Sequence, residues 1–303
     1  MKKYLLIFIF LAYFLKGDIK IKISIPKNTF QVEEEVILNV EFINSGNKTE
    51  FLNFQYLQPI EKNYLFIGDD FKLEVKANGK VIENFTNYIP PEPKPGNLKL
   101  NLKQGEKFVS FCPFTFYYYP VELPAEFTIR LKYKNNFSNP VFFKIYPTKG
   151  KVDGKSIIVN GDFKEGENFP YGWKNTFRQV KWNKKEGIIS FELNKQQASG
   201  EGMWVYSIFR EIKTPSKYIL KLKVKSENPE VIIFIEGWGI VKGRKRRIER
   251  NECFVHPDNN WNDYTFNIIF TKSEVKWFRI KIYSYLKQGK VYFDKIEMVK
   301  KSQ

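Results

Sequence analysis

The chain has 303 residues, of which 43% are hydrophobic and 17% aromatic; this excludes a chain too polar for packed cores and leaves room for two domains. Its 29 phenylalanine and 17 tyrosine residues favour strands. Fifty basic against 33 acidic residues give a formal charge of +17. That charge suits an anionic partner such as nucleic acid, a membrane surface or an acidic polymer, although scattered lysines also serve only to keep surfaces soluble.

The N-terminus has the pattern of a signal peptide. Lys2 and Lys3 precede an apolar run from Tyr4 to Leu15, shorter than the roughly 20 residues that span a bilayer. We predict a signal peptide over residues 1–17, removed near Gly17, and a secreted, periplasmic or cell-surface protein. The usual small-x-small cleavage site is missing, so an uncleaved anchor stays open. No cysteine follows the run, which argues against a lipoprotein anchor.

Export argues against an intracellular nucleic-acid protein and permits disulfide bonds. Cys112 and Cys253 lie in different halves of the chain. They can pair only if their Cα atoms come within about 7 Å. Two buried free thiols are the interpretation that we prefer.

Residues 18–150 are predicted to form short strands. IKISI and VILNVEFIN alternate apolar and polar residues, and Asn78-Gly79 marks a hairpin between two strand-like runs. The proline-rich segment 90–97 is expected to be a loop, because proline lacks a backbone donor. About seven strands without an amphipathic helix predict a β-sandwich.

The pieces VILNVEFINSGN, LNLKQGEKF and PAEFTIRLKY resemble, in order and wording, the bacterial immunoglobulin-like domains of exported proteins. The resemblance covers the whole segment, but its motifs are generic. It implies an immunoglobulin-like β-sandwich over 18–150 that acts as a spacer or an interaction module. A linker rich in glycine, lysine and proline over 147–156 sets the boundary near Lys151.

Residues 151–303 also follow strand periodicity. SKYILKLKVKS alternates cleanly, and VIIFIEGW is the nearly continuous apolar run of a central strand. In VKWFRIKIYSY, alternation points Phe278, Ile280 and Ile282 inward. The side chains expected to point outward are those of Trp277, Arg279, Lys281, Tyr283 and Tyr285.

The stretch NGDFKEGENFPYGW, residues 160–173, opens this half. It places Asn160, Gly161, Asp162 and Phe163 before Pro170, Gly172 and Trp173. Followed in order by SKYILKLKVKS, WNDYTFNIIF and GKVYFDKIEMV, it resembles the galactose-binding-like jelly rolls, in particular carbohydrate-binding modules of the family 4/9/22 type. The resemblance covers nearly all of 156–300. It implies a two-sheet jelly-roll β-sandwich, no catalysis and often a structural calcium ion.

In that family the calcium site combines oxygens near the first strand with an aspartate on the last strand. Asp162 and Asp294 hold the corresponding places here, with Glu165 nearby. Lys164 stands where an acidic residue is usual, so its ammonium group would repel calcium or pair with Asp294 in its place. The alternative is that Asp162 caps a turn and Asp294 forms a local salt bridge. Calcium is the one cofactor that the sequence suggests.

No catalytic motif is present. The one histidine, His256, precedes a proline, and the sequence contains no HExxH, GxSxG or Walker-type pattern. A glycosidase needs two carboxyl groups across a cleft, and no pair is singled out. We expect no enzymatic activity.

A sugar-binding face needs flat aromatic rings beside polar side chains. Three expected strands, GMWVYSIFREI, IFIEGWG and VKWFRIKIYSY, offer both. The candidate ligand-binding residues are Trp204, Tyr206, Glu236, Trp238, Trp277, Arg279 and Tyr283. Tryptophans of such sandwiches are often core residues, which is the alternative for these rings. Trp173 and Trp261 occupy motif positions and are expected to pack internally.

The run KGRKRRIER, residues 242–250, is the densest basic stretch. It would contact an anionic glycan, a teichoic-type polymer or a lipid headgroup, or it would protect a sheet edge from pairing, which we favour. If the run is extended, Arg244, Arg246 and Arg250 share one face.

The sequence therefore predicts an all-β, exported, non-catalytic protein that recognises a polysaccharide or cell-envelope glycan through its C-terminal jelly roll. One alternative is a structural or adhesive surface protein in which both sandwiches are scaffold. Another is a charge-driven binder of an anionic polymer or membrane surface. Membrane attachment is expected only through an uncleaved signal segment.

Overall fold

The computed structural model describes residues 19–57, 64–65, 71–83, 85, 96–175, 177, 179–200 and 202–301. The predicted signal peptide lies outside these residues. Among them, no helix is long and apolar enough to cross a membrane. The chain forms two compact units, and the boundary between them falls between Tyr146 and Pro147, near the boundary expected at Lys151. The short segments Gln31–Glu34 and Tyr118–Pro120 belong to the second unit.

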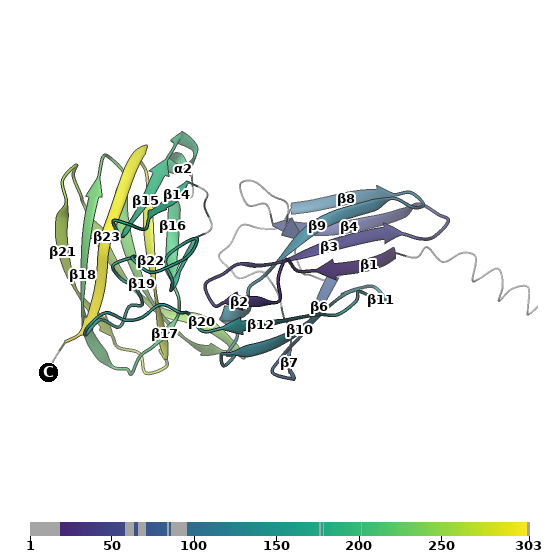
Figure 1. Cartoon of the computed structure of the whole chain (residues 1–303), viewed down its shortest axis with the longest axis horizontal. Helices are drawn as coiled ribbons and strands as arrows, with labels where there is room; N and C mark the ends of the chain where they lie inside the picture. Colours follow the sequence, from purple (N-terminus) through teal and green to yellow (C-terminus); the bar gives the residue numbers. More distant parts are fainter. Residues whose placement is uncertain are drawn as a thin grey trace, which may run out of the picture. The chain divides into compact units, whose positions relative to one another are not determined.

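The first unit consists of two sheets of mainly antiparallel strands (Figure 1). One sheet has the order β1 (Ile19–Ser24), β3 (Val36–Asn44), β9 (Lys107–Phe114), β5 (Tyr64–Leu65), β4 (Glu50–Leu57) and β8 (Gly96–Leu102). The other has the order β2 (Thr29–Gln31), β12 (Val141–Tyr146), β10 (Ala125–Tyr133), β6 (Phe71–Ala77) and β7 (Lys80–Ile82), with β11 (Asn136–Phe137) paired to β10. A 3-10 turn, η1, spans Phe116–Tyr118.

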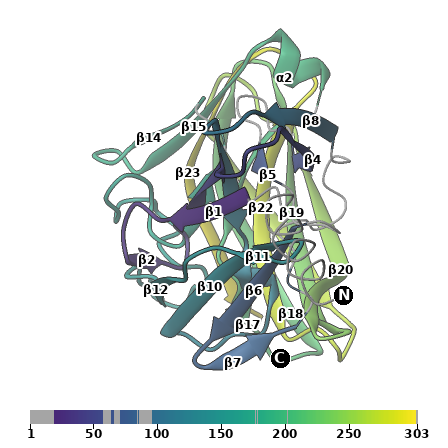
Figure 2. The same cartoon turned by 90° about the vertical axis from the view of Figure 1, so that its right-hand side faces the viewer.

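Alternation decides which side chains enter the core of this unit. Every second residue of β3 and of β6 is buried, as the period-two pattern predicts. Asn78 and Gly79 both have positive φ and join β6 to β7, so the predicted two-residue hairpin is confirmed. Strands β10, β6 and β7 lie side by side (Figure 2). The loop predicted over 90–97 lies outside the described residues except Gly96 and Asn97, which begin β8.

The second unit is also built from two sheets. The first has the order β13 (Trp173–Asn175), β16 (Met203–Ser207), β22 (Trp277–Tyr285), β19 (Glu230–Val241) and β20 (Arg244–Val255), with β17 (Arg210–Glu211) paired to β22. The second has the order β14 (Val180–Asn183), β15 (Ile188–Leu193), β23 (Gly289–Lys300), β18 (Ser216–Ser226) and β21 (Asn262–Phe270). One short helix, α2 (Lys195–Ser199), follows β15. The predicted all-β sandwich architecture is confirmed.

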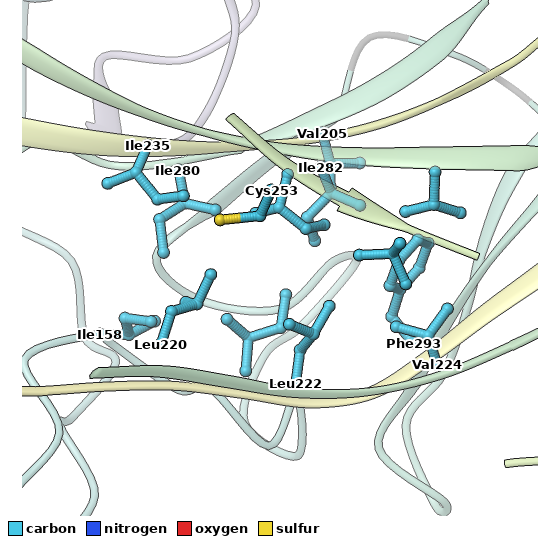
Figure 3. Close-up of a cluster of buried hydrophobic side chains, with 14 of the residues drawn as sticks. Ile158, Val205, Leu220, Leu222, Val224, Ile235, Cys253, Ile280, Ile282 and Phe293 are labelled. Atoms are coloured by element: carbon cyan, nitrogen blue, oxygen red, sulfur yellow. The ribbon is translucent and has the colours of Figure 1, made fainter. Parts of the chain in front are cut away.

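The core of the second unit lies between these two sheets. Figure 3 shows Ile235, Ile280 and Cys253 of one sheet facing Leu220 and Leu222 of the other. Burying such side chains stabilises the fold by about 1.5–3 kcal/mol each. The opposite face of the β13-β16-β22-β19-β20 sheet carries the alternate residues, and we call it the outer face.

The stretch 160–173, near the start of this unit, is hydrogen-bonded to the last strand, β23. The backbone N–H of Ile296 in β23 donates to the carbonyl oxygen of Gly161, and a Cβ added at Gly161 would collide with the carbonyl oxygen of Ile296. Trp173 is fully buried, packs edge-on against Phe163 and donates its indole N–H to the Val159 carbonyl, so its predicted packing role is confirmed. Trp261, in contrast, is 38% exposed just before β21, so its predicted packing role is wrong.

Candidate functional site

The seven candidate residues all lie on three adjacent strands, β16, β22 and β19. Trp204 is paired with Tyr283, Glu236 with Arg279, and Trp238 with Trp277, so each pair projects from the same face of the sheet. The alternate residues Phe278, Ile280 and Ile282 are buried in the core, as predicted. The candidates therefore share the outer face.

An aromatic patch surrounds the side chain of Lys281 on this face. The Lys281 Nζ lies 4.4 Å from the ring centroid of Trp204 and 4.9 Å from that of Tyr283. The rings of Tyr206 and Phe234 are both 5.7 Å away. We define the aromatic patch as the half-buried residues Trp204, Tyr206, Phe234, Tyr283 and Tyr285.

The rings of this patch hold one another in place. Trp204 lies 6.2 Å from Tyr283 and contacts Phe177 edge-on at 4.6 Å. Tyr283 stacks on Tyr285 at 5.1 Å with an interplanar angle of 24°. Because the rings contact one another and are half-buried, the patch is a preformed apolar platform.

A buried ion pair lies next to the patch. Glu236 and Arg279 are 4% and 6% exposed. The Arg279 guanidinium donates two bonds, of 3.0 Å and 2.7 Å, to one carboxylate oxygen of Glu236. Arg247 donates to the other oxygen at 3.2 Å. The indole N–H of Trp238 donates, at 3.3 Å, to the same oxygen as Arg279. Burial by itself would raise the pKa of Glu236, but the charges and hydrogen bonds of both arginines outweigh it and lower the pKa.

Glu236, Arg279 and Trp238 are therefore placed differently from the other four candidates. Trp238 is 5% exposed, and the Arg279 guanidinium lies 4.7 Å from its ring centroid. Direct contact with a ligand needs exposed atoms, and Tyr118 and Phe209 cover Trp238 and Arg279 on the outer face, so this group of three has a supporting role. Trp204, Tyr206, Trp277 and Tyr283 are half-buried and therefore partly exposed to solvent.

A second lysine lies over the aromatic ring of Trp277. Lys245 Nζ is 4.8 Å from the Trp277 centroid and 5.1 Å from the Phe209 centroid. Desolvation lowers the pKa of Lys245 to about 8, against a small opposing attraction from Glu211. Desolvation also lowers the pKa of Lys281 to about 8, with Glu236 acting in the opposite sense. Both lysines thus have ammonium groups that are partly removed from water.

The basic run forms β20, the strand next to β19. A register shift between Gly237 and Trp238 places Arg250 opposite Glu236 and Arg247 opposite Trp238. Arg250 therefore shares the outer face with Arg247 and Lys245, whereas Arg244 and Arg246 alternate to the other side. The expectation that Arg244, Arg246 and Arg250 share one face is wrong, because the β-bulge changes the alternation. Arg250 also pairs with Glu252.

The residues proposed for calcium are engaged by lysines. Asp294 lies 3.2 Å from Lys223 Nζ, and Asp162 lies 3.9 Å from Lys164 Nζ. Lys164 thus pairs with Asp162 and not with Asp294, which corrects that part of the sequence interpretation. In the described part of the chain, no group of three or more His, Cys, Asp or Glu residues is placed to hold a metal. This arrangement does not fit calcium, which needs six to eight oxygen ligands.

The one histidine of the sequence, His256, is exposed just after β20. His256 Nδ1 is 3.4 Å from Glu230, whose other carboxylate oxygen accepts a 3.0 Å bond from Lys287. The Lys287 bond lowers the pKa of Glu230 more than burial raises it.

Further residues share the outer face with the candidates, among them Phe234, Lys281 and Lys245. Phe234 and Lys281 follow from strand alternation alone, since Phe234 is two residues before Glu236 and Lys281 two after Arg279. Lys245 could not be found in this way, because its place depends on how β20 pairs with β19.

No protein-family model and no curated protein matches the sequence. Solved structures similar to the chain include a family 4 carbohydrate-binding module with 11% identity and a TM-score of 0.35; the match covers 48% of this chain and 99% of that one. A family 16 carbohydrate-binding module has 15% identity and a TM-score of 0.34 over 47% and 99% of the two chains. The C-terminal family 6 module of a laminarinase from Zobellia galactanivorans has 13% identity and a TM-score of 0.27 over 40% and 86%.

These neighbours are carbohydrate-binding modules, but identities and TM-scores this low carry no argument about a ligand. The β-sandwich is established by the strand pairing itself. The immunoglobulin-like and family 4/9/22 resemblances remain predictions.

Proposed function

We propose that the second unit binds a polysaccharide on the outer face of the β13-β16-β22-β19-β20 sheet. The observation that carries the proposal is the aromatic patch around Lys281. The apolar face of a sugar ring stacks on an aromatic ring, and its hydroxyl groups need polar neighbours. The patch offers Trp204 and Tyr283 for stacking, with Lys281 between them as a donor.

The patch is not needed to build the core. The core lies on the opposite face of the same strands, where Val205, Ile233 and Ile282 are fully buried. Rings gathered on a partly open face stabilise the fold less than the same rings in the core would. Such gathered apolar surface marks an interaction site. This favours a binding role over a purely structural or adhesive scaffold.

Our proposal also includes export and the absence of catalysis. The N-terminal pattern of lysines followed by an apolar run supports export. The outer face offers a carboxylate, Glu236, that is already bound by two arginines and is poorly suited to proton transfer. A cell-envelope glycan or another extracellular polysaccharide is the expected partner.

Affinity electrophoresis tests the proposal. The full chain migrates through native gels that contain single polysaccharides, both neutral and acidic, and at least one should retard it. Trp204→Ala should weaken that retardation by about tenfold or more, which corresponds to about 1.4 kcal/mol. Trp261→Ala is the matched control, because it removes a partly exposed tryptophan that lies outside the outer face. Migration unaffected by every polymer, or equal losses in the two variants, would refute the proposed site.

A further inference from the structure

Lys281 is a half-buried cation of the outer face. Among the described residues it forms no ion pair or hydrogen bond, and its Nζ contacts aromatic rings. The nearest elements contribute Arg279 from β22 and Arg247 and Arg250 from β20, all of which repel it. Among the charged groups of the described residues, Glu236 is the one that attracts it. An ammonium group in this setting gains strongly from an added anion.

Glu236 cannot supply the missing charge. One of its oxygens accepts both nitrogens of Arg279 and the Trp238 indole, and the other accepts Arg247. Its charge is therefore already shared between two guanidinium groups. A carboxylate in that position compensates the arginines and leaves Lys281 without a partner of its own.

The other carboxylates of the outer face are also engaged or distant. Glu252 pairs with Arg250, and Glu230 pairs with Lys287. Glu211 attracts Lys245 without forming an ion pair among the described residues. Lys245 is thus a second half-buried cation without a carboxylate in contact, set over the ring of Trp277.

We propose that the ligand is an acidic polysaccharide and that its carboxylate groups pair with Lys281 and Lys245. The inference rests on the proposed function, which it deepens by naming the substrate class. Trp277, beneath Lys245, and Lys281 are four residues apart on β22, or about 13 Å along the strand. An acidic monosaccharide reaches only one of the two lysines. A polymer with recurring acid groups reaches both, and the sugar rings beside Lys281 contact the aromatic patch.

The test uses acidic polymers together with their neutral esters. Wild-type chain is run in gels containing polygalacturonate, alginate or hyaluronate, and in gels with the esterified form of each. Neutral xylan, β-glucan and galactomannan complete the panel. We expect retardation by at least one acidic polymer, and retardation at least about tenfold weaker by its ester, because the ester removes the charge and keeps the backbone.

Three outcomes are distinguishable. Preference for an acidic polymer over its ester supports the inference. Retardation by neutral polymers, or equally by acid and ester, overturns the inference and leaves the proposed function standing. Retardation by no polymer refutes the proposed function and the inference with it.

Variants separate a specific contact from general charge attraction. Lys281→Gln and Lys245→Gln should each weaken retardation by the acidic polymer about tenfold, and Lys281→Arg should retain most of it. Lys221→Gln on β18 is the matched control, because it removes the same charge from the other sheet. Equal losses in Lys281→Gln and Lys221→Gln would show non-specific charge attraction and overturn the inference. A cooperative unfolding transition in urea verifies that each variant is folded.

Discussion

At the scale of single residues, Glu236 links three neighbouring strands on the outer face of the sheet. It lies on β19, and its partners come from β22 and β20, so one carboxylate joins three strands. A buried guanidinium without its carboxylate is strongly destabilising. The positions of Trp238 and Arg279 therefore depend on this residue, although none of the three is exposed enough to meet a ligand.

Replacing Glu236 should weaken the second unit markedly. Glu236→Gln leaves Arg279 buried and uncompensated, and we expect a loss of about 3–5 kcal/mol in the free energy of unfolding. Urea titration followed by tryptophan emission measures this, since all six tryptophans lie in the second unit. Glu192→Gln, at an exposed pair with Lys181, is the control and should cost less than about 1 kcal/mol. Equal stability of the two variants would contradict the role given to the buried pair.

Binding of an acidic polymer should depend on pH through the two lysines. Desolvation lowers the pKa of both to about 8, and only the protonated form pairs with a carboxylate. Affinity should therefore be constant between about pH 5 and 7, where the acid groups of the polymer are ionised, and fall as the pH rises through 8. The groups facing Lys281 are Tyr206 from β16, Glu236 from β19, Arg279 and Tyr283 from β22, and Arg247 and Arg250 from β20.

Titration calorimetry at several pH values measures this dependence. The variant carrying both Lys281→Gln and Lys245→Gln is the control, and its weaker affinity should vary little between pH 7 and 9. A wild-type affinity that stays constant up to pH 9 would show that neither lysine contacts the acid groups.

At the scale of elements, alternation predicted which residues of β22 point to each side. It also predicted the Asn78-Gly79 hairpin, because both features depend only on neighbouring residues. The sequence did not predict which residues of β20 lie on the outer face, because one inserted residue opposite Gly237 reverses the alternation along the rest of the strand. The places of Arg247 and Arg250 on the outer face follow from that bulge.

The close approach of the opening stretch to β23 gives a prediction at this scale. Gly161→Ala would force a methyl group against the carbonyl oxygen of Ile296 and disturb the Gly161–Ile296 hydrogen bond. We expect a loss of about 2 kcal/mol or more in the free energy of unfolding, measured by urea titration. At Gly243, in the β19–β20 turn, an added Cβ meets no atom within 4 Å. Gly243→Ala should therefore lower the free energy of unfolding by about 1 kcal/mol, through its positive φ alone. A smaller loss at Gly161 than at Gly243 would contradict the account.

At the scale of the whole molecule, composition and periodicity were sufficient to predict an all-β chain. They were not sufficient to identify which candidates are exposed. Trp204 and Trp238 have similar sequence surroundings, yet one is half-buried and the other is beneath Arg279 and Phe209. The calcium prediction depended on Asp294, whose partner Lys223 lies on a strand distant in sequence. Exposure and long-range pairing are properties of the assembled sheets.

The cysteines give a further prediction for the whole chain. Cys112 and Cys253 are both buried and neither is in a disulfide, so the structure supports the preferred interpretation of two thiols. Burial raises the pKa of Cys253 to about 12 and also raises that of Cys112, which keeps both protonated. Native protein should react with Ellman's reagent slowly, and protein in urea should release two equivalents rapidly. A disulfide detected under native conditions would contradict the structure.

The location of the binding face is the central claim, and tryptophan footprinting tests it most directly. The full chain is oxidised with N-bromosuccinimide, with and without a polysaccharide that retards it, and the extent at each tryptophan is read by mass spectrometry. We predict that the ligand protects Trp204 and Trp277 and leaves Trp261 unchanged. Protection of Trp261, with Trp204 and Trp277 oxidised as in the free protein, would place the ligand elsewhere and contradict the account.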